Sequence, residues 1–139
     1  MADALLRRAA LVLFFGYAVT LVLAGAWGAV ATRLDFPLVI GLDLSEVPPD
    51  AEADLLNHYR FLRAVELCFG IFSLVWWRRI FGERTPNLIF LATMAAGVSA
   101  RLLGLALDGT PGLLVFSVIA WEIAGVIVIF LATRPARAA

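Results

Sequence analysis

Charged residues interrupt this chain so that four apolar stretches remain, each of a length that suits a membrane crossing. A helix needs ~20 residues to cross the ~30 Å hydrocarbon layer of a bilayer, and an isolated strand would leave its backbone groups unpaired in lipid. We therefore predict an all-α integral membrane protein, an antiparallel bundle of four transmembrane helices. The predicted spans cover residues 9–32, 61–80, 88–107 and 113–133.

Composition supports a membrane protein and excludes several functions. Of the 139 residues, 63% are hydrophobic and only 16% are charged, which predicts a single membrane domain over residues 1–139. The formal net charge is zero, so the chain lacks the basic surface that nucleic-acid binding requires, and no nucleic-acid partner is expected. The lone cysteine, Cys68, cannot form an internal disulfide, which excludes thiol oxidoreductases that work through cysteine pairs.

The distribution of charge predicts the orientation. Every basic residue is an arginine, and most of them precede the first span, separate the second from the third, or follow the fourth. The acidic residues are concentrated in the two other connections. Because positive charge is retained on the cytoplasmic side of a membrane, we expect both termini to be cytoplasmic.

The connections between the spans differ in length. The links around residues 81–87 and 108–112 are short and contain glycine and proline, which predicts tight turns between antiparallel neighbours. The outer link, residues 33–57, is much longer, and we expect a loop that acts as a lid, dips into the interface or forms a short hairpin. Pro48 and Pro49 followed by Asp50 are typical of a helix start, so the second long helix is expected to begin near Asp50.

Five ionisable residues fall within or beside the predicted spans. At ~1.5 Å per residue, all five are expected in the outer half of the membrane. Charged side chains at such depth are costly, and by default they mark a functional site. The candidate ligand-binding residues are Arg60, Arg63, Glu66, Arg101 and Glu122.

Four interpretations of these five residues stay open. They can form a lattice of ion pairs that fixes the helices. They can form an outward-opening pocket for a small amphipathic or anionic ligand, because the guanidinium group binds carboxylate and phosphate groups with paired hydrogen bonds. They can also line a contact with another membrane protein or a second copy, as in an accessory subunit of a larger complex. Finally, they can take part in ion- or proton-coupled transport.

Catalysis is not favoured by these residues. A proton-shuttling role for Glu66 or Glu122 needs a neutral carboxyl group, whereas nearby arginines favour the charged form. Asp50, Asp54 and His58 share one helical stripe, but a solvated acidic face accounts for them better than a metal site does. We expect neither a metal nor a cofactor, and the only partner expected with every interpretation is the lipid bilayer.

The sequence also resembles a known family of small membrane proteins. The resemblance rests on residues 58–61 (HYRF), residues 101–111 (RLLGLALDGTP) and Glu122. These are similar to motifs of a bacterial four-helix family that is catalogued as a domain of unknown function and related to the DoxX-like group. The resemblance implies a multi-pass protein of the bacterial inner membrane without an assigned reaction. It also implies that recurrent polar positions of the family are occupied here by Arg60, Arg101, Asp108 and Glu122. Arg63 and the long outer link are departures from its pattern.

Overall fold

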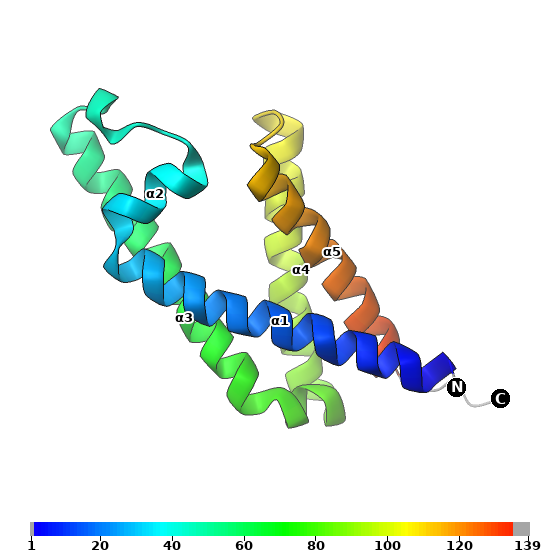
Figure 1. The fold of residues 1–139 in the computed structure, drawn as a ribbon. Coiled ribbons are helices and arrows are strands. Elements are labelled where there is room, and N and C mark those ends of the chain that lie inside the picture. Colours follow the sequence, from blue (N-terminus) through cyan, green and yellow to red (C-terminus); the bar gives the residue numbers. More distant parts are fainter. Residues whose placement is uncertain (1, 135–139) are drawn as a thin grey trace. The chain divides into compact units, whose positions relative to one another are not determined.

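The computed structural model describes residues 2–134, and all regular secondary structure in that range is helical (Figure 1). Two compact units contain these residues. The central unit comprises residues 18–72, and the terminal unit combines residues 2–17 with residues 73–134. The elements are α1 (Ala2–Val30), α2 (Thr32–Ile40), a short 3-10 turn (Leu44–Glu46), α3 (Pro49–Gly82), α4 (Arg84–Leu107) and α5 (Leu113–Thr133).

Three of the described helices, α1, α4 and α5, are long and apolar enough to span a membrane. The protein is therefore a multi-pass membrane protein. Helix α3 is longer still, at 34 residues, but its longest stretch without an acidic or basic residue is residues 67–77. At 1.5 Å per residue that segment covers roughly 16 Å, about half of the hydrocarbon layer. The fourth span, expected at residues 61–80, therefore stays a prediction.

Glycines bring α1 and α3 into backbone contact within the central unit. A methyl group on Gly25 would lie 2.6 Å from the backbone nitrogen of Leu67 and 2.7 Å from the carbonyl oxygen of Arg63. A methyl group on Gly70 would lie 2.9 Å from the carbonyl oxygen of Ala18. Because apolar burial does not drive helices together in lipid, close backbone packing of this kind is a main source of association there.

The connection expected to be a loop over residues 33–57 contains a helix instead. Helix α2 follows α1 almost directly, with the hydroxyl of Thr32 donating to the carbonyl oxygen of Gly28 at 2.7 Å. The helix ends at Gly41, whose φ of 78° suits glycine. Helix α3 then begins at Pro49, one residue before the expected start. Neither a hairpin nor a long loop forms, because the polar face of α2 has buried partners in the central unit.

The non-α segment between α2 and α3 is short and locally hydrogen-bonded. Asp43 caps the 3-10 turn by accepting a hydrogen bond from the backbone N–H of Ser45 at 2.9 Å. This bond stabilises the charged carboxylate and lowers the pKa of Asp43.

Aromatic side chains form the core of the terminal unit. Phe14 of α1 is fully buried, and its ring lies 5.2 Å from that of Phe81 and 5.1 Å from that of Phe90, between centroids. In the same unit α4 and α5 run side by side in opposite directions (Figure 1). They are joined by a turn in which Gly109 adopts a φ of 99°.

We expect Gly25→Ala to destabilise the protein by about 1–3 kcal/mol, because the added methyl group overlaps the backbone of α3 and forces the helices apart. Gly97→Ala is the matched control, since nothing lies within 4 Å of the position of its methyl group. That variant should be neutral or gain up to about 1 kcal/mol. Chemical unfolding of both purified variants in a mild detergent measures the difference, and equal effects would contradict close α1–α3 packing at Gly25.

Candidate functional site

A closed network of charged and polar side chains surrounds Arg63 in the central unit. Nη2 of Arg63 lies 2.8 Å from Oδ2 of Asp35 in α2, and Nε donates to the same oxygen at 3.0 Å. Nη1 donates to Oε2 of Glu66, one turn further along α3, at 2.7 Å. The phenol of Tyr59 donates to Asp35 at 2.6 Å and accepts from Nε of Arg63 at 2.9 Å. All three nitrogens of the guanidinium group therefore have partners.

Gly28 provides the space that this network occupies. A methyl group at Gly28 would lie 2.6 Å from Nε and Cγ of Arg63 and 2.6 Å from Oδ2 of Asp35. The guanidinium carbon of Arg63 lies 4.8 Å from the centroid of the Tyr59 ring, a cation–π contact. Arg63 is only 9% exposed, so α1, α2 and α3 enclose it together. The network is suited to holding these helices, and it offers little access to a ligand.

Arg60 has a different environment from Arg63, although both belong to α3. It is exposed, and its Nε donates to the carbonyl oxygen of Ala29 at 3.2 Å. That carbonyl belongs to the last turn of α1, where backbone acceptors lack partners within the helix and a cation is favourable. Arg60 therefore caps the end of α1.

The second ion pair at predicted membrane depth lies in the terminal unit. Nε of Arg101 in α4 lies 2.9 Å from Oε2 of Glu122 in α5. The two side chains differ in access, because that of Arg101 is 36% exposed and that of Glu122 only 8%. The carboxylate of Glu122 is thus buried, while part of the Arg101 side chain reaches the surface.

The five predicted site residues separate into two sets. Arg60, Arg63 and Glu66 belong to the central unit, and Arg101 and Glu122 belong to the terminal unit. The structure pairs Arg63 with Glu66, three residues further along α3, and Arg101 of α4 with Glu122 of α5. Convergence of all five on one site stays a prediction.

Sequence reasoning missed two members of the Arg63 network, Asp35 and Tyr59. Asp35 was assigned to the outer loop with the other acidic residues, although it is buried beside Arg63. The candidate set has three arginines and only two glutamates, and the carboxylate of Asp35 balances the remaining positive charge. The signal available was the spacing of Tyr59, Arg63 and Glu66, which places all three on one face of a helix.

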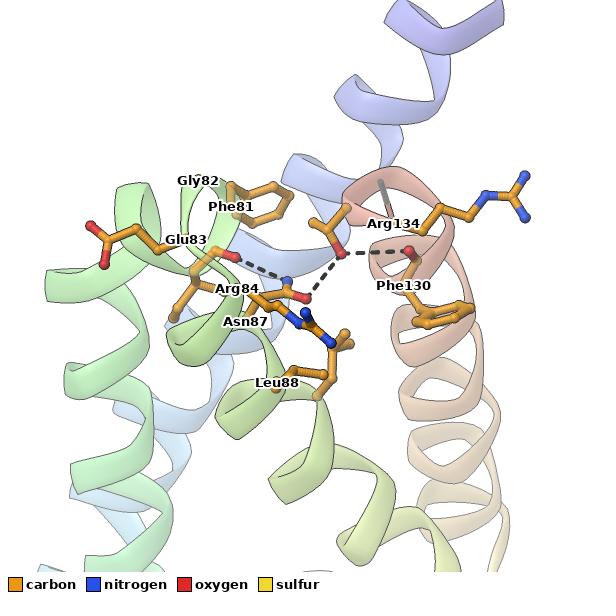
Figure 2. A pocket seen from close by; sticks show the side chains of 11 residues that line it. Phe81, Gly82, Glu83, Arg84, Asn87, Leu88, Phe130 and Arg134 are labelled. Atoms are coloured by element: carbon orange, nitrogen blue, oxygen red, sulfur yellow. Dashed lines mark hydrogen bonds between the residues drawn. The ribbon is translucent and has the colours of Figure 1, made fainter. Parts of the chain in front are cut away.

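A cavity that the sequence did not indicate lies in the terminal unit, where α3 ends, α4 begins and α5 ends (Figure 2). Its volume is about 510 Å³. Asn87 stands at its centre, donating to the carbonyl oxygen of Ile80 at 2.9 Å and lying 3.4 Å from the hydroxyl of Thr133. One amide side chain thereby links the ends of three helices.

Nearly the whole chain matches a known protein family. Residues 6–133 match the family described as a domain of unknown function, DUF4345. The chain belongs to this family. The DUF4345 match includes the Arg63–Asp35 and Arg101–Glu122 ion pairs and Asn87. It also includes all but one of the residues that line the cavity. Comparisons with curated proteins and with solved structures found no match.

Arg63→Gln should destabilise the protein by about 3–5 kcal/mol, because it leaves the carboxylates of Asp35 and Glu66 without their cation in a buried setting. Arg33→Gln is the control, since Arg33 also pairs with an acidic residue, Glu52, but its side chain is 69% exposed. Exposed pairs contribute about 1 kcal/mol or less. Unfolding in detergent compares the two, and a small loss for Arg63→Gln would show that the network does not hold the central unit.

Proposed function

We propose that this protein binds a small anionic amphiphile at the membrane, with Arg101 as the cation that anchors it. The observation that carries the proposal is the unequal exposure of the Arg101–Glu122 pair, 36% against 8%. Glu122 compensates the charge of Arg101 from the buried side, with its Oε2 2.9 Å from Nε. The exposed part of the Arg101 side chain gives access to a carboxylate or phosphate, which guanidinium groups bind in a planar, two-point manner.

Arg63 gives the contrast that supports this choice. Its guanidinium nitrogens are all engaged by Asp35, Tyr59 and Glu66, and the side chain is buried. An anion could reach it only by displacing one of these partners. Of the five candidate residues, Arg63 and Glu66 therefore fit a structural role better, and Arg101 and Glu122 fit ligand binding better.

The surroundings of Arg101 favour a ligand with an apolar part. On the face of α4 that carries Arg101, the positions three and four residues away are the apolar Gly97, Val98, Gly104 and Leu105. Ligand sites commonly combine an apolar lining with a few polar groups that fix orientation. A fatty acid or an acidic isoprenoid has this combination of groups.

We further propose that α3 is the fourth membrane span and that both termini face the cytoplasm. The pairing of Glu66 with Arg63 supports this, because a neutral pair enters lipid at lower cost than separate charges. The arginines in the first two turns of α1, in the last turns of α3 and after α5 then share one side, as the positive-inside rule requires. A bacterial inner membrane and a relationship to the DoxX-like group are parts of the same proposal, and they rest on the resemblance of the sequence motifs.

Oleate, with oleyl alcohol as the uncharged analogue, tests the ligand proposal by thermal unfolding in a neutral detergent. Oleate should raise the unfolding temperature of the wild type more than oleyl alcohol does, because only the carboxylate engages Arg101. Glu122→Gln should enlarge the oleate-specific shift, since it removes the carboxylate that competes for the guanidinium group. The double variant Arg101→Gln/Glu122→Gln, which leaves no unpaired charge, should abolish that shift.

A purely structural pair gives the opposite pattern. Glu122→Gln would then lower stability without changing the response to oleate, and oleate would act no differently from oleyl alcohol on the wild type. Stoichiometric recovery of another membrane protein with the native chain, together with that result, would favour the accessory subunit. Proton flux in liposomes that Glu122→Gln abolishes would favour the transporter.

Single cysteines introduced into a Cys68→Ser background test the four-span topology. Ser45 and Thr110 are exposed in the two outer connections, and Thr85 is exposed at the start of α4. An impermeant maleimide applied outside intact cells should label Ser45→Cys and Thr110→Cys but leave Thr85→Cys unlabelled until the membrane is opened. If α3 does not cross, Ser45→Cys and Thr85→Cys will instead share one side, opposite to Thr110→Cys.

A further inference from the structure

The cavity in the terminal unit has a composition suited to a lipid. Its walls include Leu88 and Leu91 of α4 and Phe130 of α5, which provide an apolar surface. Arg84, Asn87 and Thr133 provide charged and polar groups. At about 510 Å³ it lies within the range of ~300–1,000 Å³ that is typical of small-molecule sites.

Arg84 supplies the positive charge within this space. Its guanidinium group lies among the side chains between α4 and α5, whereas Glu83 points away from them (Figure 2). Glu83 lies 3.7 Å from Arg79, so its charge is partly compensated outside the cavity. Arg134 stands at the rim and extends outward (Figure 2). The residues that line the cavity therefore include two arginines and one acid, Glu83, whose carboxylate points away from the other side chains.

The position of Arg84 in its helix is electrostatically unfavourable without an anion. Arg84 is the first residue of α4. The N-terminal end of a helix carries partial positive charge and exposes backbone N–H donors, so a cation there is repelled and an anion is attracted. An anion bound beside Arg84 satisfies both the side chain and the helix end.

The cavity lies at the level where a membrane protein meets lipid headgroups. It is formed by the first residues of α4 and the last residues of α5, and both helices are long and apolar enough to cross the bilayer. Basic pockets between helix ends at this level are known sites for acidic phospholipids. Leu88 and Leu91 lie about one and two turns beyond Arg84 along α4, in the direction that acyl chains take.

We propose that this cavity binds the headgroup of an anionic phospholipid of the surrounding bilayer. Arg84 pairs with the phosphate, Asn87 and Thr133 border the polar part of the headgroup, and the apolar wall accepts the start of an acyl chain. The site is separate from the one proposed at Arg101. The two arginines are 17 positions apart in α4, which corresponds to about 25 Å along a helix. Either site can therefore fail without affecting the other.

Native mass spectrometry of the purified full chain in detergent tests this assignment with phosphatidylglycerol and phosphatidylcholine of identical acyl chains. The wild type should bind phosphatidylglycerol about tenfold more tightly. Both lipids offer a phosphate, but the quaternary ammonium of phosphatidylcholine cancels the charge of its headgroup and is repelled by Arg84. Arg84→Gln should remove most of that preference. Folding should tolerate this change, because a neutral residue suits the first turn of α4 better than a cation does.

Arg78→Gln is the matched control. It removes the same charge from the neighbouring end of α3, where Arg78 is exposed, lies over the ring of Trp77 and does not line the cavity. This variant should keep the preference for phosphatidylglycerol. Equal binding of the two lipids by the wild type, or equal losses in the two variants, would overturn the proposal.

Soluble glycerol 3-phosphate distinguishes a lipid from a free phosphate compound. Competition experiments should show that it displaces phosphatidylglycerol only at concentrations far above those of the lipid, because it cannot use the apolar wall. Displacement at comparable concentrations would overturn the lipid assignment in favour of a water-soluble phosphate ligand.

Discussion

The charge of Arg63 is the constraint on which the central unit depends. A guanidinium group enclosed by helices in an apolar chain is tolerated only when each of its donors finds a partner. Asp35, Tyr59 and Glu66 fill these positions, with distances of 2.5–3.0 Å. Asp35 belongs to α2, so α2 has to lie against α3, and Gly28 has to lack a side chain for the group to fit.

The same constraint explains why the connection after α1 is helical. A loop of polar residues would lie in water, whereas Asp35 has to contact the buried guanidinium group of Arg63. Helix formation pairs the backbone groups of that segment internally and presents one polar face toward α3. The capping of α1 by Thr32 and Arg60 completes the arrangement, since it provides partners for carbonyl groups at the end of that helix.

Much of the secondary structure was predictable because it depends on local patterns. The apolar runs that became α4 and α5 are bounded by glycine, proline and charge, and both ion pairs follow from local geometry. Arg63 and Glu66 are three residues apart on one helix, and Arg101 and Glu122 stand on consecutive antiparallel helices. In each case a spacing and a short turn determine the neighbours.

The features that were missed depend on tertiary contacts. Asp35 is 28 residues from Arg63, and the pattern around it is that of any acidic loop. The cavity at Asn87 combines the ends of three helices, so its volume follows from side-chain packing and from no single motif. Arg60 and Arg63 were both expected near the outer interface, and only the folded chain shows that one caps a helix while the other is enclosed.

The short turn between α4 and α5 has a consequence for biogenesis. An arginine at the middle of a nascent helix costs about 3 kcal/mol to transfer from the translocon into lipid. Arg101 and Glu122 stand on either side of a turn at residues 108–112, so the two helices can leave the translocon as one hairpin with the opposite charges already matched. In such a hairpin the charge of Arg101 enters the apolar layer together with the carboxylate that compensates it.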